Sequence, residues 1–219
     1  ALAMAGQRVL CIDMDIGLRN LDISLGLSDR ALMDFADVAL GRCTLSRAAV
    51  RHPDLKELSL LTAPMALPPS LSPYRVRSML SAARTLYDYI LIDAPAGLGP
   101  GFQYAVCGAD RALVVATNDA SSLRDAQRVV AELDWLPQVH LVMNRIQPKL
   151  LRKLRTTIDD AMNTAGLPLI GVIPEDAQVM LCANRGIPLT SQGRKGAAMA
   201  CRNIAWRLMG RRIPIMRIR

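Results

Sequence analysis

Three aspartates follow directly after short apolar runs of the chain. Asp13 and Asp15 come after residues 9–12, and Asp93 comes after residues 89–92. Carboxylates in such positions can hold Mg²⁺, usually through water, and can orient a water molecule for attack on a phosphate. Aspartates at strand ends also serve as helix caps and turn residues. Position alone therefore leaves a structural role and a catalytic role open for each of them.

The runs that precede these aspartates belong to a pattern that recurs along the chain. Six apolar runs without polar alternation predict strands covered on both faces: residues 9–12, 58–61, 89–92, 112–115, 139–143 and 169–173. Helices are predicted between and after them, over residues 72–87, 121–134, 149–165 and 196–209. This alternation predicts an α/β fold, with a doubly wound, mostly parallel sheet and helices on both faces. Its ligand is expected beyond the carboxyl ends of the strands.

The excess positive charge lies at the C-terminal end. The net charge is +8, yet no acidic residue follows Asp176, whereas nine basic residues do. Length and hydrophobic content predict one well-buried domain over residues 1–210, followed by a basic tail over residues 211–219. Pro214 opposes a helix in this tail, so we expect an extended segment. Such a segment can contact anionic lipid or nucleic acid, or can simply be a solvated surface.

Residues 13–22 read Asp-Met-Asp-Ile-Gly-Leu-Arg-Asn-Leu-Asp, and Asp93 begins Asp-Ala-Pro-Ala-Gly, a Walker-B pattern. The first string is closely similar to the motif of the division-site ATPases in the ParA/MinD family of P-loop proteins. The resemblance covers nearly the whole chain. It implies an ATPase that uses ATP and Mg²⁺ and forms an ATP-dependent homodimer.

The resemblance also implies roles for individual residues. Asp15 would position the water that attacks the γ-phosphate, Asp13 would lie near the magnesium ion, and Asp93 would be the Walker-B ligand of the metal. Gly17 and Gly97 are assigned to nucleotide binding. The adenine pocket would be lined by two further segments of the chain, which contain Asn144, Arg145, Pro174, Glu175 and Asp176.

Residues 121–125 resemble the part of a helix that relatives use near their dimer interface to contact partner proteins. Arg124 and Asp125 are the candidate contact residues, with an exposed helical face as the plain alternative. Residues 117–120 depart from the Thr-x-Pro-Glu string usual in the family, which leaves the shape of this loop open. The implied partners are division inhibitors, topological-specificity proteins and an anionic membrane surface; nucleic acid is not expected. The implied location is cytoplasmic, peripheral to the inner face of the cell membrane.

The phosphate loop of the family, Gly-x-x-x-x-Gly-Lys-[Ser/Thr], does not occur in this sequence. Residues 1–6 look like the last turns of the helix that follows this loop, with Gly6 as a left-handed stop. We therefore expect that a first strand, the loop and half a helix are missing, about 20–25 residues at usual element lengths. Without the loop, we expect the chain neither to bind ATP tightly nor to hydrolyse it. A natural paralogue that never had the loop is the alternative.

Other readings remain open on the sequence alone. A flagellar-number ATPase and a plasmid- or chromosome-partition ATPase share the expected fold, and a catalytically inactive binding module would keep the sheet without turnover. The five cysteines form no C-x-x-C pair, so neither a zinc site nor a disulfide framework is indicated. Cys107 lies where related iron proteins ligate a cluster, but no second ligand is evident. A small buried apolar role is expected for it.

Overall fold

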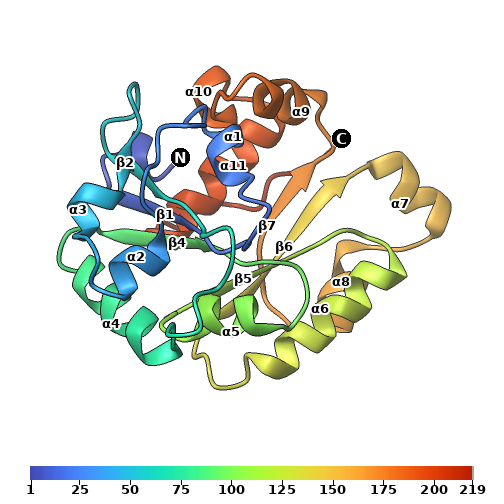
Figure 1. The fold of residues 1–219 in the computed structure, drawn as a ribbon. Helices are drawn as coiled ribbons and strands as arrows, with labels where there is room; N and C mark the ends of the chain where they lie inside the picture. The colour runs from blue at the N-terminus through green and yellow to red at the C-terminus, as the bar shows by residue number, and fades with distance from the viewer. Residues whose placement is uncertain (219) are drawn as a thin grey trace. The chain divides into compact units, whose positions relative to one another are not determined.

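The computed structural model describes residues 1–218 as two compact units. One unit comprises residues 1–109 with 182–188, and the other comprises residues 110–181 with 189–218. Each unit has its own β-sheet with helices packed around it (Figure 1). The expected α/β class with mostly parallel strands is confirmed. The expected boundary between a domain over 1–210 and a tail over 211–219 stays a prediction.

The first unit has a four-stranded sheet in the order β2-β3-β1-β4. Its strands are β1 (Val9–Asp13), β2 (Val50–Arg51), β3 (Leu58–Leu61) and β4 (Tyr89–Asp93). β1 pairs in parallel with β3 and with β4, whereas the short β2 runs antiparallel to β3. Its helices are η1 (Ala3–Ala5), α1 (Leu21–Ser24), α2 (Phe35–Ala39), α3 (Leu45–Ala48), α4 (Pro73–Ala83) and α5 (Pro100–Val106). Gly6 ends η1 in the left-handed conformation, as predicted.

An apolar core joins this sheet to its helices. Leu10 and Ile12 of β1 are fully buried in one cluster with Phe35 of α2 and Val76 of α4. Burying each such side chain contributes about 1.5–3 kcal/mol. The Ser72 hydroxyl caps α4 by accepting a main-chain N–H of its first turn. The core therefore fixes β1, whose last residue is the first of the candidate site residues.

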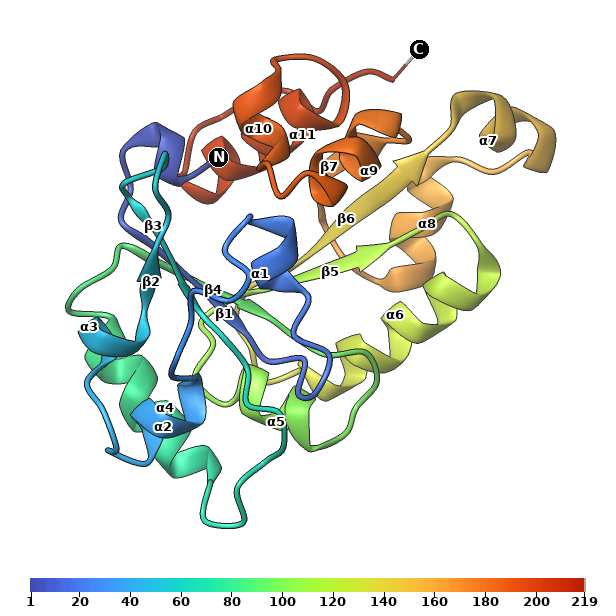
Figure 2. The same ribbon diagram turned by 45° about the horizontal axis from the view of Figure 1, so that its top comes forward.

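The second unit has a three-stranded parallel sheet in the order β5-β6-β7. Its strands are β5 (Ala112–Ala116), β6 (Val139–Ile146) and β7 (Leu169–Pro174). The remaining helices are α6 (Ala120–Glu132), α7 (Pro148–Leu154), α8 (Ile158–Ala165), α9 (Ala177–Asn184), α10 (Leu189–Gln192) and α11 (Gly196–Leu208). α6 and α8 cover one face of this sheet and α11 covers the other (Figures 1 and 2).

α11 packs closely on β7 and holds the segment that follows it. A methyl group at Gly171 would overlap the Ile204 side chain, so the helix can approach only because the strand has a glycine there. The Arg207 guanidinium donates to the carbonyls of Ile170 at 2.7 Å, Ile213 at 2.9 Å and Pro214. Residues 211–218 contain neither helix nor strand, as expected for the tail.

The predicted helix over 149–165 is wrong in one respect, because the chain forms two helices there. Arg155 takes the left-handed conformation, with φ of 51°, and ends α7. Thr157 then caps α8 in a capping box with Asp160, in which each side chain accepts the other residue's main-chain N–H. A helix end at Arg155 and a helix start at Thr157 thus divide a segment whose apolar spacing suits one helix.

Candidate functional site

Two of the predicted aspartates end neighbouring parallel strands of the first unit. Asp13 closes β1, Asp93 closes β4, and the two residues are partners in the register of the strands. The Met14 N–H donates to the Asp93 carbonyl at 3.0 Å, which extends the pairing one residue beyond β1. The two residues therefore lie together at one edge of the sheet, as the sequence predicts. Their chemical roles remain predictions.

Asp13 organises the loop that follows β1. Its side chain is 1% exposed, and its two carboxylate oxygens accept the N–H of Asp15 at 2.9 Å and the N–H of Leu21 at 3.2 Å. Gly17 lies inside the loop with φ of 87°, a conformation that glycine adopts without strain. The first aspartate of the motif thus ties both ends of the loop to the strand.

The surroundings of the Asp93 carboxyl disfavour its ionised form. Burial raises its pKa above the usual range, and the negative charges of Asp13 and Asp15 raise it further. A cation placed among these groups would relieve the repulsion and favour the ionised form of Asp93. The cluster therefore has the electrostatic character of a cation site.

These carboxylates fit magnesium in the way the ion is held in phosphate-binding proteins. Within residues 1–218, no three or more His, Cys, Asp or Glu side chains form a ready cage for a metal. Mg²⁺ usually takes only one or two carboxylates and completes its shell with water and substrate phosphates. Asp93, with Asp13 beside it, matches that smaller donor set.

Gly97 lies in the loop between β4 and α5. Its φ of 82° places it in the left-handed region, and no atom lies within 4 Å of where a side chain would begin. The main chain is therefore open on that side. This openness is what a backbone approached by a phosphate requires, and it agrees with the predicted role without testing it.

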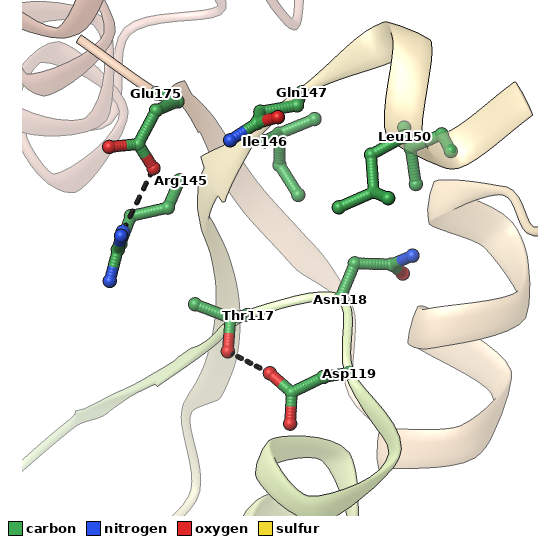
Figure 3. Close-up of a pocket in the computed structure, with 9 residues that line it drawn as sticks. Thr117, Asn118, Asp119, Arg145, Ile146, Gln147, Leu150 and Glu175 are labelled. Carbon is green, nitrogen blue, oxygen red and sulfur yellow. Dashed lines mark hydrogen bonds and ion pairs between the residues drawn. The ribbon is translucent and has the colours of Figure 1, made fainter. Parts of the chain in front are cut away.

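A pocket of about 230 Å³ opens beyond the carboxyl ends of β5, β6 and β7 in the second unit. Figure 3 shows that its lining side chains come from four segments of the chain. The lining residues are Thr117, Asn118 and Asp119 after β5, Arg145, Ile146 and Gln147 at the end of β6, Leu150 and Leu151 of α7, and Glu175 after β7. Ligand sites in open parallel sheets are expected at this end of the strands.

Two of the five predicted base-pocket residues line this pocket. Arg145 and Glu175 lie side by side at one edge of the pocket and form an ion pair, with Nε and Oε2 2.8 Å apart (Figure 3). Asn144 and Pro174 do not line it, and the Asn144 side chain instead accepts the N–H of Arg145 at 2.9 Å. The pairing of Arg145 with Glu175 leaves the pocket with one apolar wall, formed by α7, and one charged wall.

Asp176 is also absent from the pocket lining, and its carboxylate has a structural use. One oxygen accepts the N–H of Gln178 in the first turn of α9, and the other accepts the N–H of Ala197 in the first turn of α11, both at 3.0 Å. Negative charge at helix N-termini is favourable. Asp176 thus ties together two segments that are far apart in the sequence.

Residues 117–119, which follow β5, line the pocket although the sequence did not predict a binding role for them. Asp119 caps α6 by accepting the N–H of Ser122 at 2.9 Å. Hydrogen bonds from the hydroxyls of Ser121 and Thr117, followed by that main-chain bond, lower the pKa of Asp119 to about 2. It therefore lines the pocket as an anion at neutral pH. An aspartate just after a strand and before a helix was the available signal.

Neither the partner-contact candidates nor Cys107 is part of this pocket. Arg124 and Asp125 lie exposed on α6, where Asp125 is 3.8 Å from Arg128. The Cys107 side chain packs half-buried against the core of the first unit, its thiol donates to the Tyr104 carbonyl at 3.2 Å, and burial raises its pKa. In the part of the chain that the structure describes, no helix is long and apolar enough to cross a membrane.

Comparisons with known proteins converge on one family. Residues 1–189 match the model of the CobQ/CobB/MinD/ParA nucleotide-binding domain. The septum site-determining protein MinD of Bacillus subtilis is 36% identical over 98% of this chain and 82% of its own length, and that of Helicobacter pylori is 38% identical over 97% and 83%.

Solved structures agree with these sequence matches. The MinC:MinD cell division protein complex of Aquifex aeolicus aligns with a TM-score of 0.91 at 36% identity, over 99% of this chain and 88% of that one. MinD of Pyrococcus horikoshii, complexed with Mg-ADP, aligns with a TM-score of 0.81 at 26% identity, over 94% and 85%.

Proposed function

This chain belongs to the CobQ/CobB/MinD/ParA nucleotide-binding family and is a MinD-like cell-division ATPase, and we propose that it places the division septum by ATP-dependent dimerisation on a membrane. The observation that carries the proposal is the Asp-Met-Asp-Ile-Gly-Leu-Arg-Asn-Leu-Asp motif, whose first aspartate is the register partner of Asp93. Relatives 36–38% identical over nearly the whole chain support it.

We assign the chemistry to the aspartates of the first unit. Asp93, supported by Asp13, would hold Mg²⁺, which when bound neutralises charge on the phosphates. Asp15 would orient the water for in-line attack on the γ-phosphate, since its main chain is fixed by Asp13 while its side chain remains half-buried. In such phosphoryl transfers the protein contributes position and charge rather than covalent chemistry.

We assign the adenine to the pocket of the second unit. Leu150 and Leu151 offer an apolar surface for a purine ring, and the Asn118 and Gln147 side chains carry amides able to pair with its edge. Asn118 already donates to the Thr156 hydroxyl at 2.8 Å, which fixes its orientation. The pocket would thus select a flat ring with hydrogen-bonding edges. Asn144, Pro174 and Asp176 would act only by shaping the surrounding loops.

The proposed activity requires a phosphate loop, which this sequence does not contain. We expect no magnesium-dependent ATP turnover from the 219-residue chain. Turnover is expected when the phosphate-loop segment of a relative is joined ahead of Ala1. In that form, Asp15→Ala should abolish hydrolysis while ATP binding survives, because Asp15 orients water and is not assigned to binding.

Asp54→Ala provides the matched control, because Asp54 is exposed and lies outside both assigned sites. Equal turnover of the Asp15→Ala variant and its parent would contradict the assignment of Asp15. Absence of both binding and turnover in the joined protein would favour an inactive binding module.

The partner proposals follow from the same relatives. We propose an ATP-dependent homodimer that binds a division inhibitor through Arg124 and Asp125 of α6, and a cytoplasmic location with peripheral contact to anionic membranes. The Aquifex aeolicus MinD is solved in complex with MinC, which supports an inhibitor as partner. Arg124→Ala should weaken capture of that partner, whereas Arg75→Ala on α4 should not. Equal capture by both variants would remove α6 from the interface.

A further inference from the structure

α7 and the residue that ends it carry an unbalanced charge. Between residues 148 and 158, every charged side chain is basic: Lys149, Arg152, Lys153 and Arg155. All four are exposed, and no ion pair neutralises them within the described residues. The nearest acidic residues in sequence, Asp159 and Asp160, belong to α8, where Asp160 is engaged in the capping box. The charge of α7 is therefore available to a ligand.

The same helix exposes apolar surface. Leu150 is 46% exposed and Leu154 is 51% exposed, and their i, i+4 spacing places them on one face of the helix. Leaving large aliphatic side chains in water is unfavourable. Leucines flanked by lysines and arginines are typical of helices that lie in a membrane interface.

The position of α7 suits contact with an extended surface. In both views the helix stands at the periphery of the second unit, beyond the tip of β6 (Figures 1 and 2). A helix in this position can enter a layer of headgroups.

We propose that α7 docks on an anionic lipid surface, with Leu154 entering the interface and the four cations contacting the headgroups. The choice of lipid rests on the membrane association proposed above. The site itself is new and is distinct from the C-terminal tail. Each cation near such a surface strengthens binding about fivefold. Burial of Leu154 adds an apolar contribution that a lipid interface provides and a purely polar polyanion does not.

The test is sedimentation of the 219-residue chain with vesicles of phosphatidylglycerol and phosphatidylcholine in equal parts, at low salt. The double variant Arg152→Ala/Lys153→Ala is expected to bind about 30-fold more weakly. Leu154→Ser is expected to weaken binding about tenfold. None of these three residues lines the pocket. Lys56→Ala/Arg75→Ala removes two charges from exposed sites elsewhere and should change binding much less.

Each contrary outcome has a distinct meaning. Wild-type binding in both α7 variants, with loss only in Arg211→Ala/Arg212→Ala, would overturn the α7 site and keep the membrane association. Absence of binding by the wild type would overturn both. Sensitivity to the α7 charges but not to Leu154→Ser would identify a general polyanion site, such as one for nucleic acid or an acidic protein, and would overturn the lipid proposal. Circular dichroism would verify that each variant is folded.

Discussion

Replacing Asp176 should destabilise the protein, because its carboxylate caps two helices at once. The N–H groups of Gln178 and Ala197 both donate to it at 3.0 Å. Losing a helix cap costs about 1 kcal/mol, so Asp176→Ala should lower the free energy of unfolding by about 2 kcal/mol. In a chain of this size, that loss corresponds to a fall in Tm of roughly 4–8 °C. Asp176→Asn keeps one acceptor and should lose about half as much.

Gly196 provides an independent check on the same carboxylate. It begins α11 with φ of 52°, and a methyl group there would overlap the Asp176 side chain. Gly196→Ala should cost about 1–2 kcal/mol for the left-handed backbone, and in addition should displace the carboxylate from its two donors. In the Asp176→Ala background, only the backbone cost remains. The two substitutions should therefore be less damaging together than the sum of the single variants.

The assay is urea unfolding followed by circular dichroism for the two single variants and the double variant. Glu175→Ala is the matched control, because it removes a neighbouring carboxylate whose ion pair with Arg145 is partly exposed and worth at most about 1 kcal/mol. A change below about 0.5 kcal/mol for Asp176→Ala, or full additivity with Gly196→Ala, would refute the capping argument. Reduced nucleotide affinity without a loss of stability would instead support the predicted role in base binding.

Three further outcomes follow from the packing and the charges. Asp93→Asn should stabilise the protein at neutral pH in metal-free buffer. The pKa of Asp93 is raised in the folded state, so the folded parent loses stability as pH rises above the ordinary aspartate range, whereas the variant does not. Denaturation at a series of pH values would reveal this difference. Gly171→Ala should cost about 1–3 kcal/mol through overpacking, against little change for Gly99→Ala in open space, as measured by thermal unfolding. Arg207→Ala should release residues 211–218, because its guanidinium donates to the carbonyls of Ile213 and Pro214, and should speed tryptic cleavage at Arg211; unchanged cleavage would show that other contacts hold the tail.

The strands were predictable because parallel strands with apolar faces read as continuous apolar runs. The expectation that all six are covered on both faces is wrong for β4 and β5, where Leu91, Leu113 and Val115 are exposed. All six expected runs are strands, and only the two-residue β2 was missed, since so short a run carries no periodicity. The break between α7 and α8 was not predicted, because the left-handed residue that ends α7 is Arg155 and not glycine. A conformation imposed by context on an ordinary residue leaves no signal in composition.

The candidate site also contains residues that the sequence predicts and residues that it does not. The aspartates at the ends of β1 and β4 were found because strand-end position can be read from the sequence alone. The pocket was found only in part, since Thr117, Gln147 and Leu151 come from segments brought together by the sheet. The cap that Asp176 provides for α11 was equally hidden, because its second donor lies 21 residues further along the chain. Residues whose role depends on their position along the chain can be predicted from the sequence, whereas residues brought together only by folding cannot.

The register of β1 against β4 has a consequence for how such a site tolerates evolutionary change. Because main-chain hydrogen bonds hold Asp13 beside Asp93, the separation of the two residues is set by the strand spacing of about 4.8 Å rather than by the identity of the residues before them. Valine, leucine and isoleucine can replace one another along both strands without moving either aspartate. The sheet therefore keeps the two aspartates at a fixed spacing even when the apolar residues of the strands change.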